Sequence, residues 1–208
     1  MIKTLNGVRL VRFEPEQHTL IAYHWQNSGE YGEFFRAMPV PASMREIAVA
    51  LDGKTMMVVA NDQVVGAIMH FNQDEIARNF EVAILMDKAA EKKGIGFTAL
   101  KMFLNWKFNA CNLYLAEFNT LERNRRLHDA LINFGALYEG TRRKRAFVDR
   151  FQNVSNFSII NKEFNDLYQQ EFNQGKDTLR GNKNGQESSR TFEAVPGAAV
   201  RGAGELTQ

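Results

Sequence analysis

Two glycines and two lysines make up the stretch of this sequence whose residue types could do chemistry. Gly94 and Gly96 follow the apolar run Val82–Met86, which is short enough for one buried strand, and they precede an amphipathic pattern typical of a helix. Glycines let backbone N–H groups approach an anion, and a helix N-terminus adds about half a positive charge. Lys92 and Lys93 add cations beside the turn. The pattern fits a phosphate-binding turn, or two glycines that only ease a loop.

The common nucleotide-binding patterns are missing from this turn. The sequence has no G-x-x-x-x-G-K-[ST] there, so a nucleoside-triphosphate loop is unsupported. The third glycine of the dinucleotide-binding fingerprint is also missing. If the turn binds an anion, we expect a pyrophosphate site of another kind.

Several segments in a fixed order resemble the GNAT acyltransferases. Glu91-Lys92-Lys93-Gly94-Ile95-Gly96 is similar to the family's pyrophosphate loop, whose usual form is Q/R-x-x-G-x-G/A. Asn124 lies eleven residues before Gly135, as in the family's Asn-initiated helix that ends in Gly-Phe. Further similar segments are Leu137–Gly140, Phe157–Ile160 and Glu163-Phe164. The resemblance covers about residues 7–167 and is nearest to the branch that acetylates N-termini of ribosomal proteins, with its antibiotic-modifying relatives.

The resemblance implies that acetyl-CoA is the cosubstrate and that an amine, on a protein N-terminus or a small molecule, is the acceptor. Backbone groups of the central strand would pair with the pantetheine arm, and the glycine turn would hold the pyrophosphate. The residues implied to bind the cofactor are Ile84, Leu85, Met86, Lys92, Lys93, Gly94, Ile95, Gly96 and Asn124. Asn124 is open to a second interpretation as a helix cap, and Arg125 and Arg126 beside it could meet the CoA 3′-phosphate or only face solvent.

The resemblance implies one catalytic residue, and its departures leave a second to be chosen. Glu81, at the start of the central strand, resembles the general base of several GNAT enzymes, although it could equally be an exposed carboxylate at a strand end. The usual acid positions, seven and three residues after the family's Asn, hold Leu131 and Leu127, and neither can give a proton. Tyr138, Tyr114 or water would then protonate the leaving thiolate, and Tyr138 is our candidate. Without such a donor, catalysis would be slow or absent.

Hydrophobic periodicity predicts an α/β (α+β) domain: a mixed, mostly antiparallel GNAT-like sheet flanked by helices. Ser43 and Glu46 have the spacing of a capping box, and Asn61-Asp62 is a hairpin turn signal. Tyr31, Phe34 and Phe35 lie in an irregular segment and would wall a substrate groove or cap the core. The expected strands are 8–13, 55–60, 63–71, 78–86, 112–118, 137–142 and 151–160, and the expected helices are 14–27, 43–51, 94–108, 122–134 and 161–172.

Size and composition restrict the other possibilities. The chain has 208 residues and 44% hydrophobic content, which suits one domain with an appendage. Cys111 is the sole cysteine, so a disulfide framework and a cysteine-based zinc site are excluded, and a reducing, cytoplasmic setting is the default. The four histidines lack metal-ligand spacing, and no apolar run reaches membrane-spanning length. A net charge of +2 is too mild to argue for nucleic-acid binding.

The last part of the sequence supports a rival hypothesis. We expect the domain to span residues 1–172, because residues 173–208 are rich in Gly, Ser and Asn and are typical of a flexible tail. Such a tail could bind a protein partner or a further copy of the chain. The rival hypothesis is therefore a catalytically weakened GNAT-fold component of a larger assembly.

Overall fold

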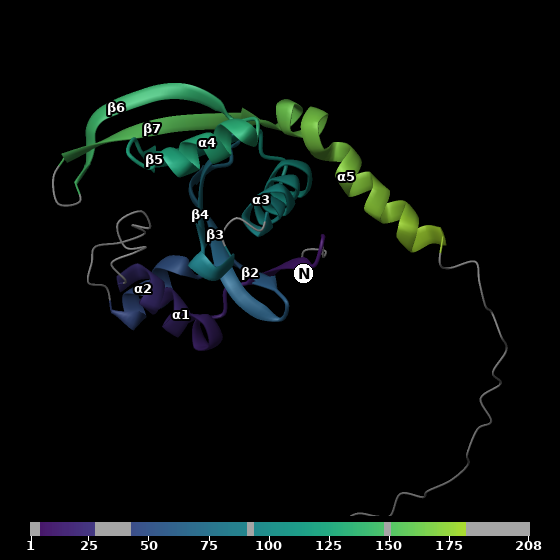
Figure 1. Cartoon of the computed structure of the whole chain (residues 1–208), viewed down its shortest axis with the longest axis horizontal. Coiled ribbons are helices and arrows are strands. Elements are labelled where there is room, and N and C mark those ends of the chain that lie inside the picture. The colour runs from purple at the N-terminus through teal and green to yellow at the C-terminus, as the bar shows by residue number, and fades with distance from the viewer. Residues whose placement is uncertain (1–4, 28–42, 91–93, 148–150, 182–208) are drawn as a thin grey trace, which may run out of the picture.

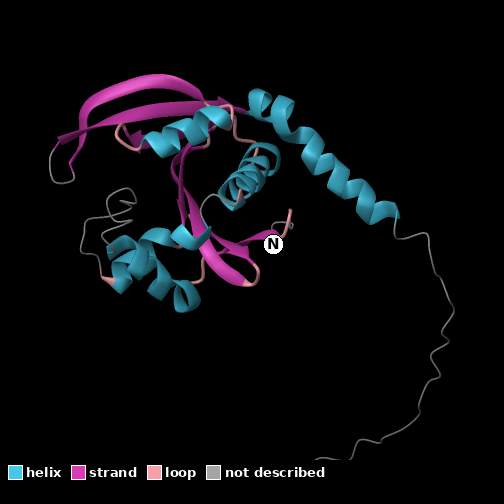
Figure 2. Cartoon of the chain, viewed as in Figure 1, coloured by secondary structure: helices cyan, strands magenta, loops and turns pink. Residues whose placement is uncertain are grey.

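A twisted seven-stranded sheet organises the chain in the computed structural model, which describes residues 5–27, 43–90, 94–147 and 151–181 (Figure 1). Helices lie on both of its faces (Figure 2). The strands are β1 Val8–Arg12, β2 Thr55–Ala60, β3 Gln63–Asp74, β4 Asn79–Met86, β5 Leu115–Leu121, β6 Leu137–Phe147 and β7 Phe151–Ile160. The helices are α1 Pro15–Asn27, α2 Met44–Leu51, the 3₁₀ turn η1 Lys88–Ala90, α3 Ile95–Asn105, the π turn η2 Trp106–Ala110, α4 Arg125–Asn133 and α5 Asn161–Gly181.

The strand order is β1-β2-β3-β4-β5-β7-β6, and the pairing of β4 with β5 is the parallel one. All the other neighbouring strands pair antiparallel. Because a parallel connection needs a crossover, α3 runs from the end of β4 back to the start of β5. The predicted mixed, mostly antiparallel sheet is confirmed.

Each face of the sheet carries its own hydrophobic core. On the first face, α3, α4 and α5 pack against β3, β4, β5 and β7 around aromatic rings that include Phe80, Phe103 and Phe108. On the second face, α1 and α2 pack against β1–β4 around Trp25, Met57 and related side chains. Burying a side chain of this size contributes about 1.5–3 kcal/mol. In the part of the chain that the structure describes, the second face of β5, β7 and β6 contributes to neither core.

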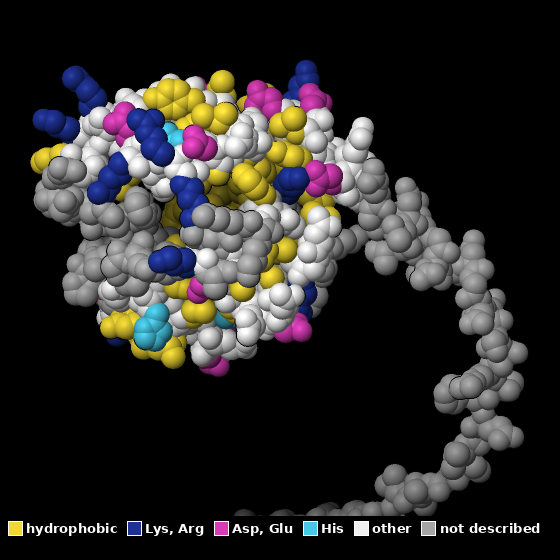
Figure 3. All heavy atoms as spheres, in the orientation of Figure 1, with side chains coloured by type: hydrophobic (Ala, Val, Ile, Leu, Met, Phe, Trp, Pro, Cys, Tyr) yellow, Lys and Arg dark blue, Asp and Glu magenta, His cyan; other side chains and the backbone are white. Residues whose placement is uncertain are grey.

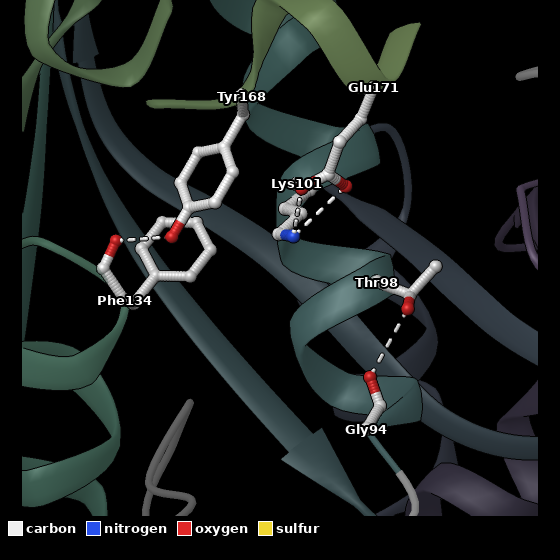
Figure 4. Close-up of polar contacts among 6 residues, drawn as sticks. All are labelled: Gly94, Thr98, Lys101, Phe134, Tyr168 and Glu171. Carbon is white, nitrogen blue, oxygen red and sulfur yellow. Dashed lines mark hydrogen bonds and ion pairs between the residues drawn. The ribbon is translucent and has the colours of Figure 1, made fainter. Parts of the chain in front are cut away.

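Helix α5 holds α3 and α4 together. The Lys101 ammonium of α3 donates to the Glu171 carboxylate at 2.7 and 3.0 Å, and the Tyr168 hydroxyl donates to the Phe134 carbonyl at 2.7 Å (Figure 4). The Lys101 ammonium also lies 4.3 Å from the centre of the Tyr168 ring. These contacts fix the two helices that flank the parallel strand pair.

Local sequence chemistry accounts for the predicted boundaries that hold. Ser43 Oγ accepts the Glu46 N–H at 3.3 Å and the Glu46 carboxylate accepts the Ser43 N–H at 2.7 Å, so the capping box is present. Asn61 and Asp62 have φ of 51° and 59°, as a tight hairpin turn requires. Strands β2 and β7 have the predicted bounds.

Several elements differ from the predicted bounds: β3 continues to Asp74 rather than 71, β6 continues to Phe147 rather than 142, and α4 begins at Arg125 rather than 122. Strand β5 begins at Leu115 rather than Asn112, because Asn112 has φ 56° and the Tyr114 N–H donates to the Arg78 carbonyl. Helix α5 continues past Phe172 to Gly181, which places helix where we expected the tail to begin. Residues 182–208, the rest of the predicted tail, lie outside the described residues.

Candidate active site

The parallel strands β4 and β5 diverge part-way along their length. They are paired at three positions, Asn79 with Leu115, Phe80 with Ala116 and Glu81 with Glu117. Among the described residues, β4 beyond this point pairs with β3 alone, and β5 pairs with β7 alone. We call the space between residues 82–86 and 118–121 the β4–β5 opening. In Figure 3 the surface is hollowed between the β5–β7 half and the α1–α2 half, with hydrophobic side chains inside and Lys and Arg side chains around it.

Alternate residues of β4 direct their backbone groups into this opening. Asp87 N–H donates to the Val65 carbonyl across the antiparallel β3–β4 pair. By alternation, Leu85 also uses its backbone groups toward β3, whereas those of Ile84 and Met86 point the other way. The two predicted cofactor-binding residues Ile84 and Met86 therefore present N–H and C=O groups to the opening, and Leu85 does not.

Helix α3 begins at the open end of β4. Gly94 precedes its first residue with φ 73° and ψ −5°, a left-handed conformation that glycine adopts at low cost. The Gly94 carbonyl accepts the Thr98 N–H at 3.0 Å and the Thr98 hydroxyl at 3.2 Å (Figure 4), which closes the first turn. Helical geometry leaves the first N–H groups, including those of Ile95 and Gly96, without helical partners. They form a candidate anion site.

The first turn of α3 rests directly on β4. A Cβ atom at Gly96 would lie 3.2 Å from Met86 Cγ, so glycine lets the helix approach the strand closely. No described residue comes within 4 Å of the place where a Cβ at Gly94 would lie. The turn is thus packed against the strand on one side and open on the other.

Helix α4 begins at the open end of β5. Asn124 Oδ1 accepts the Leu127 N–H at 3.3 Å, so the interpretation of Asn124 as a helix cap holds. This bond uses the side-chain oxygen, and the amide nitrogen can still donate to a ligand. Arg125 and Arg126 are exposed in the first turn. Because β4 and β5 are parallel, the N-termini of α3 and α4 flank the same opening.

Two carboxylates stand where the strands part. Glu81 is half-buried, and its Oε1 accepts the Asn72 amide N–H at 2.9 Å. Glu117 is its direct partner on β5, and Ser158 is the partner of Glu117 on β7. Residues in one row of a sheet share a face, so these side chains lie on the second face, opposite α3. Ser158 Oγ donates to Glu139, which adds a third carboxylate beside this row.

The proposed proton donors lie elsewhere. Tyr138 is on β6, with β5 and β7 between it and the opening, and its hydroxyl lies 2.6 Å from Thr141 Oγ1. Tyr114 precedes β5 at the paired end of the strands. Leu131 is 2% exposed in the core and Leu127 packs against that core. The structure therefore brings Glu81 to the opening but does not bring Tyr138 next to it.

Some predicted residues cannot be placed, and some placed residues were not predicted. Glu91, Lys92 and Lys93 lie outside the described residues, as do Tyr31, Phe34 and Phe35. Sequence reasoning missed Glu117 and Asn72. The predicted strand 112–118 already contains Glu117, but nothing local shows that Glu81 is its partner.

A pair of bases, one half-buried and one buried, lies behind the site, on the face that α3 covers. Burial, with a further effect of the nearby Lys107 charge, lowers the pKa of His70 to about 4. Burial likewise lowers the pKa of Lys107, which is 3% exposed on η2. The Lys107 ammonium donates to Gln73 Oε1 at 2.9 Å and lies 4.9 Å from the centre of the Trp106 ring. His70 is therefore neutral near pH 7.

Two further findings concern metals and membranes. Among the described residues, no group of three or more His, Cys, Asp or Glu side chains could hold a metal ion. The helices in that part of the chain are all too short or too polar to cross a membrane.

Comparison with known proteins identifies the fold. No protein-family model matches the chain, and no curated protein matches its sequence. Among solved structures, spermidine N-acetyltransferase from Vibrio cholerae, in complex with CoA and spermine, matches with a TM-score of 0.70 at 16% identity, over 77% of this chain and 99% of that one. A provisionally assigned acetyltransferase from T. thermophilus matches with a TM-score of 0.68 at 18% identity, over 82% of this chain and 95% of that one.

The chain has the GNAT fold. The predicted fold is thereby confirmed over about three-quarters of the chain. At these identities the likeness concerns the GNAT fold alone, and the nearer resemblance to the branch that acetylates ribosomal proteins stays a prediction. In this GNAT-fold protein, β4 and β5 diverge at the centre of the sheet, and a helix begins after the end of each strand. This arrangement is the candidate active site.

Proposed function

We propose that the protein is an acetyl-CoA-dependent N-acetyltransferase that acts on an amine. The observation that carries this proposal is the β4–β5 opening, with backbone groups along one edge that no described strand pairs, two helix N-termini at its wide end and Glu81 at its narrow end. These features match the three parts of acetyl-CoA in order. The diphosphate is anionic, the pantetheine arm carries amides, and the thioester is the reacting end.

The chain's own groups suffice to hold the cosubstrate. The N–H groups at the start of α3 would receive the diphosphate, and the helix dipole favours the negative charge there. The backbone groups of Ile84 and Met86 would pair with the pantetheine amides as a neighbouring strand does. Asn124 and the exposed Arg125 and Arg126 would contact the phosphates from the α4 side. Lys92 and Lys93 remain predicted contacts.

The reaction needs one base at the narrow end. Bound acetyl-CoA supplies an acetyl thioester, whose carbonyl carbon the amine nitrogen attacks. An amine that arrives as an ammonium ion first loses one proton to solvent. As the C–N bond then forms and the C–S bond breaks, the nitrogen gives up a second proton and the sulfur leaves as a thiolate. Glu81 would take the amine proton, directly or through water, because it is the carboxylate at the point where β4 leaves β5. Positioning of the two reactants supplies much of the remaining acceleration.

The carboxylates on the second face support a positively charged acceptor. An amine near pH 7 arrives as an ammonium ion. Glu117 and Glu139 lie with Glu81 on the second face of the sheet, in the part formed by β5 and β7 that α1 and α2 do not cover. Spermidine N-acetyltransferase from Vibrio cholerae, of the same fold, was solved with spermine. This favours a small-molecule amine, and a protein N-terminus is the alternative that the resemblance implied.

The rival function, a weakened GNAT-fold binding component, has one specific observation in its favour. Leu127 and Leu131 are packed in or against the core, so neither of the family's usual acid positions offers a proton here. Deletion of residues 182–208 tests the rival. If the tail mediates assembly, the deletion changes the mass of the particle in sedimentation; an unchanged mass and unchanged partners would remove the support for it.

Calorimetry and mass spectrometry test the enzyme. We expect acetyl-CoA to bind the purified chain, and a panel of spermidine, spermine and short peptides with free N-termini to include an acceptor that gains one acetyl group. Glu81→Gln should lower turnover by about 10²-fold or more and leave acetyl-CoA affinity within twofold. Absence of any binding heat at millimolar acetyl-CoA would overturn the proposal.

A further inference from the structure

A bulge in β3 brings an amide to the carboxylate at the narrow end of the opening. Phe71 is directly across from Glu81, and the next β3–β4 pair is Asp74 with Asn79. Two residues of β3, Asn72 and Gln73, therefore oppose a single residue of β4, as in a β-bulge. Asn72 has φ 45°, and its side-chain N–H donates to Glu81 Oε1 at 2.9 Å.

The bulge is anchored from the opposite face of the sheet. Gln73 Oε1 accepts the Lys107 ammonium N–H at 2.9 Å. Lys107 is 3% exposed, and its ammonium also lies 4.9 Å from the centre of the Trp106 ring and 5.8 Å from that of Phe80. Because a buried ammonium is costly without partners, this contact holds Gln73 in place. The two bulge residues thus face opposite sides of the sheet: Gln73 contacts the buried Lys107, and Asn72 contacts Glu81.

Such a contact matters because Glu81 has a neighbour of the same charge. Glu117 is its direct partner on a strand about 4.8 Å away, and two carboxylates at this separation repel each other. Repulsion alone would turn the Glu81 side chain away from the opening. The Asn72 amide opposes this by binding one carboxylate oxygen, and it leaves the other oxygen to accept a proton.

We propose that Asn72 is a positioning residue that holds Glu81 for proton transfer, and that the bulge of β3 exists to place it. The inference rests on the proposed acetyltransferase function. In this arrangement the amide does not touch the substrates. It acts through Glu81, so its loss lowers turnover without weakening acetyl-CoA binding.

Asn72→Gly is the decisive variant, because glycine adopts the left-handed backbone without strain and removes only the amide. We expect turnover to fall about tenfold, with acetyl-CoA affinity and thermal stability within error of the unaltered chain. Asn72→Asp, which tolerates the same backbone but adds a charge beside Glu81, should lose more. Asn61→Gly is the matched control: Asn61 has φ 51° in the distant β2–β3 turn, so its replacement should leave turnover unchanged.

A spectroscopic readout separates this inference from the proposed function. In ¹⁵N-labelled protein without substrates, Glu81→Gln should shift the side-chain amide resonance of Asn72 and leave that of Asn61 in place. An unmoved Asn72 resonance would overturn the contact whether or not the protein is an enzyme. If the unaltered chain acetylates amines and Glu81→Gln impairs it, but Asn72→Gly does not, the positioning role is overturned and the enzyme stands. Failure of all acetyl-CoA binding would overturn the enzyme, while the resonance shift would still decide the contact.

Discussion

Replacing Gly96 with Glu should block the anion site at the start of α3 without unfolding the chain. A Cβ here meets Met86 Cγ at 3.2 Å, and the flexible methionine side chain can move by a few tenths of an ångström. Replacing glycine with Glu in the first turn of a helix also gains about 0.5 kcal/mol of helix propensity, which offsets part of that crowding. The fold should therefore survive, and any loss of binding should come from the site.

The size of the effect follows from the added charge. A carboxylate about 7 Å from one charge of the diphosphate, at an effective dielectric constant of about 20, is repelled by about 2.4 kcal/mol. Acetyl-CoA affinity should thus fall by about 50-fold.

Gly96→Gln is the matched control, since it has the same shape without the charge. Calorimetric titration with acetyl-CoA at about 0.05 M and about 1 M salt measures both variants, and salt should restore part of the loss in the Glu variant alone. If Gly96→Glu binds acetyl-CoA as tightly as the unaltered chain at low salt, α3 does not hold the diphosphate.

Three further outcomes are expected. Tyr138→Phe should keep turnover within about twofold, because β5 and β7 separate Tyr138 from the opening; a loss of tenfold or more in a steady-state assay would restore it as the proton donor. As pH falls from 6.5 toward 4, the unfolded chain protonates His70 before the folded chain does. The free energy of unfolding measured in urea should therefore fall by about 1–2 kcal/mol, after a reduction for solvent screening at the half-buried ring. His70→Asn should remove that pH-dependent loss. A double-mutant cycle on Lys101 and Glu171 should give a coupling of about 0.5–1 kcal/mol, and zero coupling would show that the pair does not fasten α5 to α3.

Sequence reasoning succeeded where structure depends on neighbours along the chain. The Ser43 capping box and the Asn61-Asp62 turn are chemistry within four residues, and both are present. Helix α5 was predicted to end at 172, because Phe164, Tyr168 and Phe172 recur at a spacing of four and all contact the core, and residues 173–181 do not continue that repeat. That spacing is typical of a helix that packs along one side.

The parts of the site that sequence reasoning missed depend on pairing between distant segments. Glu81 and Glu117 become neighbours through strand register, and Asn72 reaches Glu81 through a bulge that has no sequence signature of its own. Glu81 was predicted through a family resemblance rather than through its surroundings. Tyr138 was a candidate because the family's usual acid positions hold Leu127 and Leu131, and the sequence did not show that β5 and β7 lie between Tyr138 and the opening.

Among the described residues, three paired positions between β4 and β5 join the β1–β4 half of the sheet to the β5–β7–β6 half. Met86, five residues beyond Glu81, lies roughly 16 Å along β4 from that junction, at about 3.3 Å per residue. A rotation of about 5° between the two halves of the sheet would therefore move Met86 by about 1.4 Å. A small change of side-chain volume at the junction thus produces a larger displacement at the wide end of the β4–β5 opening. Under the proposed function, acetyl-CoA affinity should therefore respond to side-chain volume at Phe80 and Ala116, two core residues far from the proposed diphosphate site.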